Sequence, residues 1–342
     1  FAPGASANVG GLVATTHGIS NSDFMAGSNR FTRDGATGSV INEGQLGAGL
    51  GGYIALLAPE VRNTGVVIAQ MGTVALAAGE AYELQFTNGS LANIQVEPAT
   101  LAALVDNRHA VQAPDGFIIL SAQAADHLQG GVVRNSGSLE ANGLVNDGGT
   151  IRLLASDRVV HSGGISVDAA RGSGGNGGTA MLISDLGNPD SQTVVSGSIN
   201  ARGGELGGNG GFIETSGHWL NVSGSRINAS ASRGQSGLWL LDPYDVTIGS
   251  SASGTTYASS FVPGADSTTL ASDIATTLQG GTSVTITTGT SGGSNGDITV
   301  ADAITKASGN TDVTLTLQAA NSIVVDQAIS NTGGSGKLNV VL

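Results

Sequence analysis

The sequence lacks cysteine and has little proline, and each shortage excludes a class of protein. Without cysteine, the 342-residue chain is not one of the small secreted domains that depend on disulfides. Cysteine-free chains suit export in an unfolded state, because a premature disulfide would block threading through a pore. Seven prolines are too few for a proline-rich disordered linker. No run of about 18 apolar residues occurs, so we expect no membrane-spanning helix.

Positive charge is equally scarce. The 13 basic residues face 26 acidic ones, which gives a formal net charge of −13, and the only lysines are Lys306 and Lys337. Such a surface repels phosphate backbones, and the sequence shows no basic stripe that could hold one. We therefore expect no nucleic-acid partner. Charged residues make up 11% of the chain, less than half the usual share of about 25%, and aromatic residues only 4%.

What the chain has in abundance is repetition. An apolar pair, a corner of small residues and a second short alternating run occur four times, at 132–143, 159–169, 194–204 and 221–230. Between the copies lies a second recurrent element, Gly-Gly-Thr or Gly-Gly-Phe followed by apolar residues, at 148–154, 177–183 and 210–215. Corners recur every 27 to 34 residues or so, a period typical of solenoid proteins.

These short runs have a period of two and are broken by Gly, Asn and Ser, which predicts strands and excludes helices. The chain is longer than one compact core usually serves, yet no clear linker divides it. A solenoid explains both facts, because each coil buries its inner face only against its neighbours. The predicted fold is an all-β, right-handed, single-stranded parallel β-helix. If the Gly-Gly-Thr register holds, Ile151, Leu153 and Ile165 point inward.

Several segments depart from the repeat. Residues 81–96 form two alternating runs about Asn88-Gly89, the strongest short hairpin signal. Apolar spacing of three and four predicts a short helix at 100–108, so we expect an excursion of hairpin and helix on the flank at 81–108. Further short helices are expected at 123–128 and 271–278. Residues 249–268 are rich in Ser, Thr, Gly and Ala and suggest a loop, after which coil-like runs return.

The acidic residues that could act in catalysis are better explained as turn residues, and the histidines do not have the pattern of a metal site. The acids Asp185, Asp190, Asp242 and Asp245 lie among turn residues, where Asp and Asn bond their own backbone. The histidines lack metal-ligand spacing and a carboxylate pair nearby in sequence; they are His17, His109, His127, His161 and His218. We therefore predict no catalytic, cofactor-binding or metal-binding residue and no cofactor, and no ligand-binding residue is identified.

Two glycine-rich loops and two tryptophans are best explained by ordinary structural roles. The loops at 171–178 and 203–211 lack the Gly-Lys-Ser/Thr of a phosphate loop, and we interpret their glycines as corner residues with positive φ. Trp219 and Trp239 could form carbohydrate platforms, but packing in the core or at an end is the favoured interpretation.

Three motifs carry a resemblance to a known family. They are Pro-Gly-Ala at 3–5 with Val-Gly-Gly-Leu at 9–12, Ile-Ser-Asn-x-Asp-Phe at 19–24, and Leu-Asp-Pro-Tyr-Asp-Val-Thr-Ile at 241–248. Together they resemble filamentous-haemagglutinin-like exoproteins of the two-partner secretion pathway. That family has an Asn-Pro-Asn-Gly motif just upstream of this point, so we expect the chain to begin inside the secretion domain. The expected division is 1–165 for the secretion domain, 166–248 for coils of the stem, and 249–342 for a Ser/Thr/Gly-rich segment with additional repeats.

The resemblance implies a non-catalytic protein that is secreted or displayed on the bacterial surface. Its implied partner is an outer-membrane β-barrel transporter that recognises the secretion domain, and the stem would begin a fibrous adhesin with a role in virulence. A host-cell or neighbouring-cell receptor or polysaccharide is a further implied partner. Two alternatives remain open: the same export module carrying a toxin or haem-acquisition passenger, and a β-helical enzyme that acts on polysaccharides.

Overall fold

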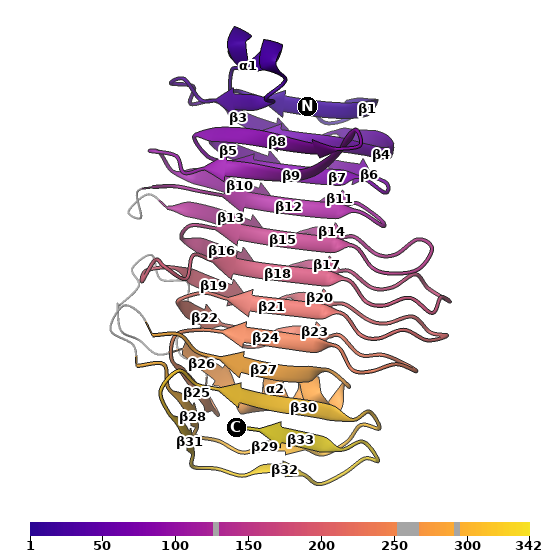
Figure 1. The fold of residues 1–342 in the computed structure, drawn as a ribbon, viewed down its shortest axis with the longest axis vertical. Coiled ribbons are helices and arrows are strands. Elements are labelled where there is room, and N and C mark those ends of the chain that lie inside the picture. The colour runs from indigo at the N-terminus through magenta and orange to yellow at the C-terminus, as the bar shows by residue number, and fades with distance from the viewer. Residues whose placement is uncertain (126–129, 252–266, 291–294) are drawn as a thin grey trace. The chain divides into compact units, whose positions relative to one another are not determined.

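The computed structural model describes residues 1–125, 130–251, 267–290 and 295–342. Internal contacts divide these residues into two units: unit 1 comprises 1–142 and 149–165, and unit 2 comprises 143–148 and 166–342. Each unit is a parallel β-helix, in which strands of successive coils lie side by side (Figure 1). The predicted fold class is thereby confirmed. In the described part of the chain, no helix is long and apolar enough to cross a membrane.

Unit 1 is built from two parallel sheets and one antiparallel decoration. The long sheet contains β1 (Ser6–Thr15), β4 (Gln45–Leu57), β6 (Val66–Ala69), β7 (Thr73–Ala78), β11 (Ala110–Gln112), β12 (Phe117–Ala122), β14 (Ser138–Glu140), β15 (Thr150–Ala155) and β17 (Gly164–Ser166). The flank sheet contains β3 (Ser39–Asn42), β5 (Glu60–Asn63), β10 (Ala103–Asn107), β13 (Gly131–Asn135) and β16 (Arg158–His161). The decoration, here called the hairpin sheet, contains β2 (Arg30–Thr32), β8 (Ala81–Thr87) and β9 (Ser90–Glu97).

The interior of unit 1 consists of ladders of aliphatic side chains. Parallel register aligns Ile54, Val74, Ile118 and Ile151 on four neighbouring strands, and all four are fully buried. A second ladder, two residues further along each strand, contains Leu56, Leu76, Leu120 and Leu153. The predicted inward direction of Ile151, Leu153 and Ile165 is confirmed, since each is at most 1% exposed.

A ladder of buried amides runs along the flank sheet. The Nδ2 atom of Asn42 donates to Oδ1 of Asn63 at 2.8 Å, and the same bond joins Asn63 to Asn107 at 2.8 Å and Asn107 to Asn135 at 2.7 Å. The Nδ2 atom of Asn135 then lies 3.0 Å from Nδ1 of His161. All five side chains are completely buried. Because an amide nitrogen can only donate, Nδ1 of His161 must be the acceptor in this arrangement.

The hairpin at 81–96 is confirmed, but the helix expected at 100–108 is wrong. β8 and β9 pair antiparallel about Asn88-Gly89, where Asn88 has a φ of 52° and Gly89 a φ of 82°. Residues 103–107 instead form β10, which pairs in parallel with β5 on one side and β13 on the other. Backbone hydrogen bonds on both edges and full burial of Val105 outweigh the weak local helix signal. The excursion therefore ends before β10.

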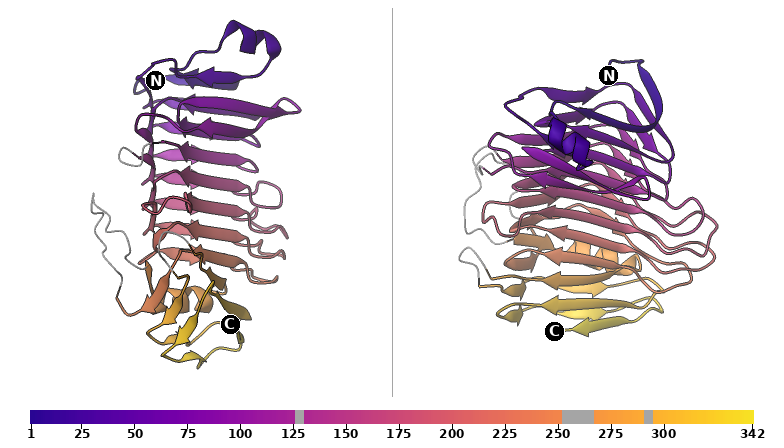
Figure 2. Two further views of the ribbon diagram at one scale, coloured as in Figure 1. Left: turned by 60° about the vertical axis from the view of Figure 1, so that its left-hand side comes forward. Right: turned by 45° about the horizontal axis from the view of Figure 1, so that its top comes forward.

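A short helix, α1 (Asn21–Ala26), was not predicted. Oγ of Ser20 caps its N-terminus by accepting from the backbone N–H of Asp23 at 3.0 Å, and Gly27 ends it in the left-handed conformation. Both signals are visible in the sequence, but six residues are too short for an amphipathic period. Figure 2 shows α1 beyond β1, at the N-terminal end of unit 1. The helix predicted at 123–128 is not formed by 123–125, and the rest lies outside the described residues.

Unit 2 continues the same architecture with its own strands. One sheet contains β18 (Thr179–Ser184), β20 (Ser198–Asn200), β21 (Phe212–Ser216), β23 (Arg226–Asn228), β24 (Leu238–Asp242), β27 (Ser283–Thr287), β30 (Val313–Gln318) and β33 (Leu338–Val341). β19 (Gln192–Val195) pairs with β22 (Trp219–Asn221). A further sheet contains β25 (Val246–Gly249), β26 (Ser267–Leu270), β28 (Ile298–Val300) and β31 (Ile323–Val325). The last sheet pairs β29 (Ile304–Lys306) with β32 (Ile329–Asn331). The predicted helix near 271–278 is confirmed as α2 (Ala271–Gln279).

The core of unit 2 contains the largest buried side chain of the described residues. Trp239 is in register with Ile213 and Val284 and is fully buried, and its indole N–H donates to Oγ1 of Thr215 at 3.1 Å. The favoured interpretation of Trp239 as a packing residue is confirmed. Trp219, in β22, is partly buried.

The two glycine-rich loops of unit 2 owe most of their glycines to crowding. Only Gly172 and Gly208 have the positive φ that was expected for these loops, at 71° and 81°. At Gly177 φ is not positive, but a Cβ atom would lie 2.0 Å from the carbonyl oxygen of Ala201 on the next coil. The expectation of positive φ throughout was wrong, because coil-to-coil backbone contact excludes a side chain at most of these positions.

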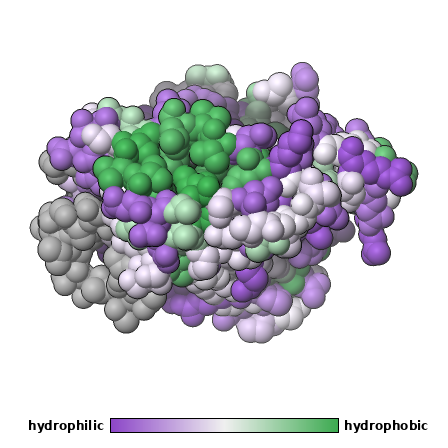
Figure 3. All heavy atoms as spheres, turned by 90° about the horizontal axis from the view of Figure 1, so that it is seen from below, coloured by the Kyte–Doolittle hydropathy of each residue, from purple (hydrophilic) through white to green (hydrophobic). Residues whose placement is uncertain are grey.

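The last strands of unit 2 show how burial depends on a neighbouring coil. Leu315 of β30 is fully buried, whereas its register partner Val340 of β33 is 42% exposed. Val300 of β28 is likewise buried, and its partner Val325 of β31 is 45% exposed. Figure 3 looks onto this end and shows apolar side chains gathered in one patch. An inner position is thus protected from water only when a further strand covers it.

One of the two lysines is buried and supports the turns of the final coils. The side chain of Lys306 is completely buried, and its Nζ atom donates to the carbonyl oxygens of Gly309 at 3.1 Å and Gly336 at 2.9 Å. The other, Lys337, is exposed. Composition alone does not distinguish the two.

We expect Lys306→Gln to lower the free energy of unfolding by about 1–2 kcal/mol, because the shorter amide satisfies at most one of the two carbonyl oxygens. Urea denaturation followed by circular dichroism measures the change. Lys337→Gln makes the same change in charge on the surface and should alter stability by less than about 0.5 kcal/mol. Equal effects of the two substitutions would contradict a structural role for Lys306.

Candidate functional site

The hairpin sheet is the largest element of unit 1 outside the repeating coils. Its inner face packs on the coils through a cluster that joins Tyr82, Leu84, Leu91 and Ile94 to small and aliphatic residues of β4 and β7. Tyr53 of β4 adds an edge-to-face contact with Phe86, with ring centroids 5.1 Å apart. The hairpin sheet therefore packs on the coils through buried apolar side chains.

Two ion pairs lie at the edges of the hairpin sheet. Nε of Arg33 lies 2.9 Å from Oε2 of Glu80, and Nη2 of Arg30 lies 2.7 Å from Oε1 of Glu97. The side chains of the first pair are 13% and 33% exposed, and the Arg33 guanidinium holds the pKa of Glu80 below its ordinary value. The second pair is largely exposed and contributes little to stability.

A buried histidine lies where β1 meets the hairpin sheet. Nε2 of His17 is 3.2 Å from the carbonyl oxygen of Gly79, and its ring lies 4.7 Å from that of Tyr82. The hydroxyl of Tyr82 accepts from the backbone N–H of Gly79 at 2.9 Å. Burial lowers the pKa of His17, and the Gly79 carbonyl opposes this effect only in part. Neutral His17 is therefore the form that stabilises the folded chain.

The pKa of His17 predicts a pH dependence of stability. Below the unfolded-state pKa of about 6.5, the unfolded chain binds a proton that buried His17 resists, so stability should fall as the pH is lowered through that value. The loss levels off below the folded-state pKa. His17→Gln keeps a hydrogen-bond donor toward Gly79 but cannot titrate, so its unfolding free energy should depend less on pH between 7.5 and 5. Parallel pH profiles of wild type and variant in urea denaturation would contradict this.

Two exposed apolar side chains lie next to each other on α1. Phe24 is 69% exposed and Met25 is 82% exposed, on a helix in which no residue is buried. Clustered exposed apolar residues, unlike scattered ones, often mark a surface that contacts another protein. Sequence reasoning missed this feature because it missed the helix.

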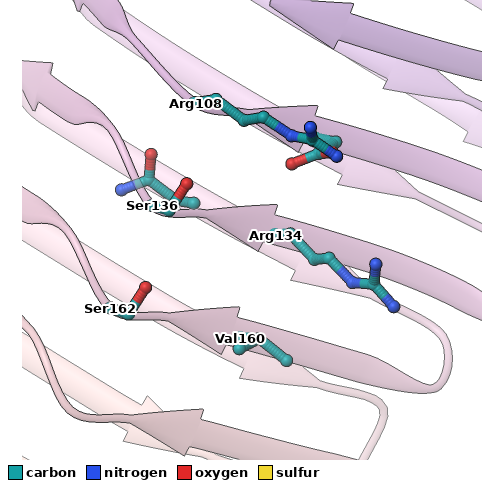
Figure 4. Close-up of a pocket in the computed structure, with 7 residues that line it drawn as sticks. Arg108, Arg134, Ser136, Val160 and Ser162 are labelled. Atoms are coloured by element: carbon teal, nitrogen blue, oxygen red, sulfur yellow. The ribbon is translucent and has the colours of Figure 1, made fainter.

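A polar hollow lies on the flank sheet of unit 1. It has a volume of about 210 Å³ and is lined by equivalent positions of three successive coils. Two rows of side chains line it. One row consists of Asp106, Arg134 and Val160 on the strands, and the other consists of Arg108, Ser136 and Ser162 at the corners that follow the strands. Asn135 of the amide ladder lies between the two rows. Figure 4 shows the arginine side chains running in the same direction from neighbouring coils. We call this site the arginine hollow.

One carboxylate organises the arginine hollow. Asp106 has a side chain only 5% exposed, and its Oδ2 accepts from Arg108 at 2.6 Å. Asp106 is also the direct neighbour of Arg134 in the parallel register, and of Arg62 on the other side. The neighbouring carboxylate raises the pKa of Arg108. Both arginines that line the hollow, and both serines, are exposed.

The four aspartates weighed as catalytic candidates take part in structural hydrogen bonds. Oδ1 of Asp185 accepts from the N–H of Gly187 in its own turn at 2.8 Å. Two of the others depart from the expected local pattern: Oδ1 of Asp242 accepts from the Thr287 hydroxyl at 2.7 Å, and Oδ1 of Asp245 accepts from two backbone N–H groups at 296–297. Asp190 contributes its backbone N–H, which donates to Oδ1 of Asn188 at 3.0 Å.

The histidines are dispersed, but one of them lies near acids that the sequence places far away. The ring of His218 contacts that of Tyr244, with centroids 4.1 Å apart, and burial lowers its pKa while the charges of Asp190 and Asp245 oppose this. His109 is exposed, and His127 lies outside the described residues. Nor do the described residues contain a group of His, Asp or Glu that could hold a metal ion.

Comparison with known proteins identifies the family of the first unit. Residues 1–167, which include all of unit 1, match the family model of the TPS secretion domain. Among solved structures, the secretion domain of HMW1 from Haemophilus influenzae is similar, with a TM-score of 0.61 and 19% identity over 99% of this chain and 76% of that chain. No curated protein matches the chain. Residues 1–167 are therefore a secretion domain of the two-partner secretion (TPS) family, carried on a parallel β-helix.

Proposed function

We propose that this chain is the export module and the first part of the stem of a non-catalytic exoprotein. Residues 1–165 would be recognised in the periplasm by an outer-membrane transporter, and 166–248 and 249–342 would begin a fibrous adhesin stem on the cell surface. The match of residues 1–167 to the TPS secretion domain carries the proposal. A toxin or haem-acquisition passenger would use the same module, and sequence beyond residue 342 distinguishes these cases.

The ladders support folding by templating outside the cell. Each coil offers paired backbone edges and an apolar row to the next, and Val340 stays 42% exposed where no further strand covers it. A chain that emerges unfolded would therefore gain burial coil by coil, and each coil extends the stack by about 4.8 Å. This stepwise gain would oppose sliding back through the transporter.

We expect the exposed side chains of α1 to contact the transporter. Purified chain should bind the immobilised periplasmic region of a two-partner transporter, and the double variant Phe24→Ser, Met25→Ser should bind at least about tenfold more weakly, because apolar anchors dominate such interfaces. Leu206→Ser in unit 2 removes a side chain of similar exposure, 65%, and should leave binding unchanged. Surface plasmon resonance measures all three.

Absence of binding by the wild-type chain would overturn the proposed recognition, whereas equal binding by the α1 variant would move the contact to another surface of unit 1.

Enzymatic action on polysaccharides is tested separately by a reducing-sugar assay on acidic and neutral substrates. Alanine variants at Asp185, Asp190, Asp242 and Asp245 should fold and remain displayed. A cleavage activity abolished by one of them would refute the non-catalytic proposal.

A further inference from the structure

Five Asn-Gly pairs occur in the chain, and the structure places them in two kinds of surroundings. The asparagines of these pairs are Asn88, Asn142, Asn176, Asn209 and Asn295. An asparagine followed by glycine is prone to deamidation, because glycine has no Cβ atom to hinder attack by its backbone nitrogen on the preceding side-chain amide. By sequence alone the five pairs are equally reactive, so any difference between them comes from the fold.

Deamidation is an intramolecular substitution at the asparagine side chain. The glycine backbone nitrogen loses its proton to hydroxide and bonds to Cγ of the asparagine. The bond from Cγ to Nδ2 then breaks, and ammonia leaves with a proton supplied by water. A second water molecule opens the cyclic imide at either carbonyl, which gives aspartate or isoaspartate. The attack therefore needs a glycine N–H without another partner and an asparagine side chain that is free to turn toward it.

Four of the five pairs have a glycine N–H that already donates a hydrogen bond. In three of them the acceptor is a backbone carbonyl oxygen of another segment of unit 2, at 2.8 to 3.0 Å: Gly143 donates to Asp168, Gly177 to Asn209, and Gly210 to Gln235. In the fourth, Gly296 donates to Oδ1 of Asp245 at 2.7 Å. Each bond holds the proton on the nitrogen and directs the nitrogen away from its own asparagine.

Two of these four asparagines are also held by their side chains. Oδ1 of Asn176 accepts from the backbone N–H of Asn209 at 2.8 Å, and Oδ1 of Asn209 accepts from that of Gln235 at 2.9 Å. Rotation of either amide toward its own glycine would break these bonds between stacked loops. The stacking that orders the loops of unit 2 thus also opposes their deamidation.

The pair Asn88-Gly89 differs in each of these respects. It forms the tip of the hairpin between β8 and β9, and both residues are exposed. Neither the Asn88 side chain nor the Gly89 N–H bonds to any described residue. A Cβ atom built on Gly89 would have no heavy atom of another residue within 4 Å, apart from its chain neighbours. The tip can therefore rotate into the geometry of attack without colliding with the coils.

We propose that Asn88 is a modification site at which the folded chain deamidates to aspartate and isoaspartate, while folding protects the other four Asn-Gly pairs. Isoaspartate adds a methylene group to the backbone of the two-residue turn, across which Thr87 and Ser90 face each other. The modification should therefore loosen this last pair of the hairpin. The buried residues Tyr82 and Leu91 keep the rest of the hairpin sheet packed on the coils. The site is independent of the proposed contact with the transporter.

Incubation of the full 342-residue chain at mildly alkaline pH, followed by peptide mapping with mass spectrometry, tests the proposal. In the folded chain Asn88 should deamidate at least about tenfold faster than each of the other four asparagines, because release of a bonded N–H slows the attack by about that factor or more. In concentrated urea the five rates should converge. An Asn88 rate no faster than the others in the folded chain would overturn the proposal, as would the same ranking of rates in urea, since local sequence would then decide the reaction.

Two variants test the assigned residues. Asn88→Gly removes the reactive amide but permits the positive φ of this position, so its hairpin peptide should stay unmodified in a folded chain. Asp245→Ala removes the acceptor of the Gly296 N–H, so Asn295 should deamidate at least about tenfold faster while the rate at Asn88 stays the same. An unchanged rate at Asn295 in the folded variant would overturn protection by hydrogen bonding of the glycine N–H.

Discussion

Ile151→Asp should abolish the cooperative fold of unit 1 at neutral pH. Ile151 is completely buried and stacks on Ile118 of the neighbouring coil, so the substitution places an unpaired carboxylate between apolar rows. Such a charge costs several kcal/mol, comparable with the total stability of many domains, about 5–15 kcal/mol. Thermal unfolding followed by circular dichroism should lose its transition, and export should stall at this coil.

The neighbouring residue provides the control for this prediction. Arg152 follows Ile151 in β15 but is exposed, so Arg152→Asp introduces the same side chain on the outer face and should change stability by less than about 1 kcal/mol. Burial raises the pKa of a carboxylic acid, so the Ile151→Asp variant should regain structure as the pH falls and the acid becomes neutral. Similar unfolding curves for the two variants would mean that the inner row is not the determinant of stability.

Asn107→Ala should destabilise unit 1 by about 3–5 kcal/mol, an effect unusual for the loss of a polar side chain. Its Oδ1 accepts from Asn63 and its Nδ2 donates to Asn135 and to the carbonyl oxygen of His109. Removal leaves buried partners on both sides unsatisfied, each at a cost of about 1–3 kcal/mol. Urea denaturation measures the loss, and hydrogen exchange should show it concentrated in the flank sheet.

Asn93→Ala is the comparison, because Nδ2 of Asn93 donates to Gln85 at 3.2 Å in a partly buried position of the hairpin sheet. Loss of that single bond should cost about 1 kcal/mol or less. If Asn107→Ala is as mild as Asn93→Ala, water or a shifted neighbour replaces the missing amide, and the ladder is not a cooperative element of the fold.

The secretion domain, the parallel β-helix and its inward residues were predictable because they rest on local and periodic features. The alternation around Ile151 fixes which side chains face inward once strands are assumed, and the Asn-Gly pair at 88–89 specifies a hairpin through backbone conformation alone. The family resemblance of the first motifs was likewise visible in the sequence. No local signal distinguished the strand 103–107 from a helix, because partner strands from two other coils decide that conformation.

The candidate sites show the same division. The sequence by itself determined a repeating apolar pattern, the corner residues after each strand and a negative chain with few basic residues. Only the tertiary structure decided that Asn42, Asn63, Asn107 and Asn135 form one ladder, and that Asp106 and Arg134 from different coils lie side by side. The reason is physical: stacking brings residues about 20 to 50 positions apart within hydrogen-bonding distance, and the irregular lengths of the connections set which residues meet.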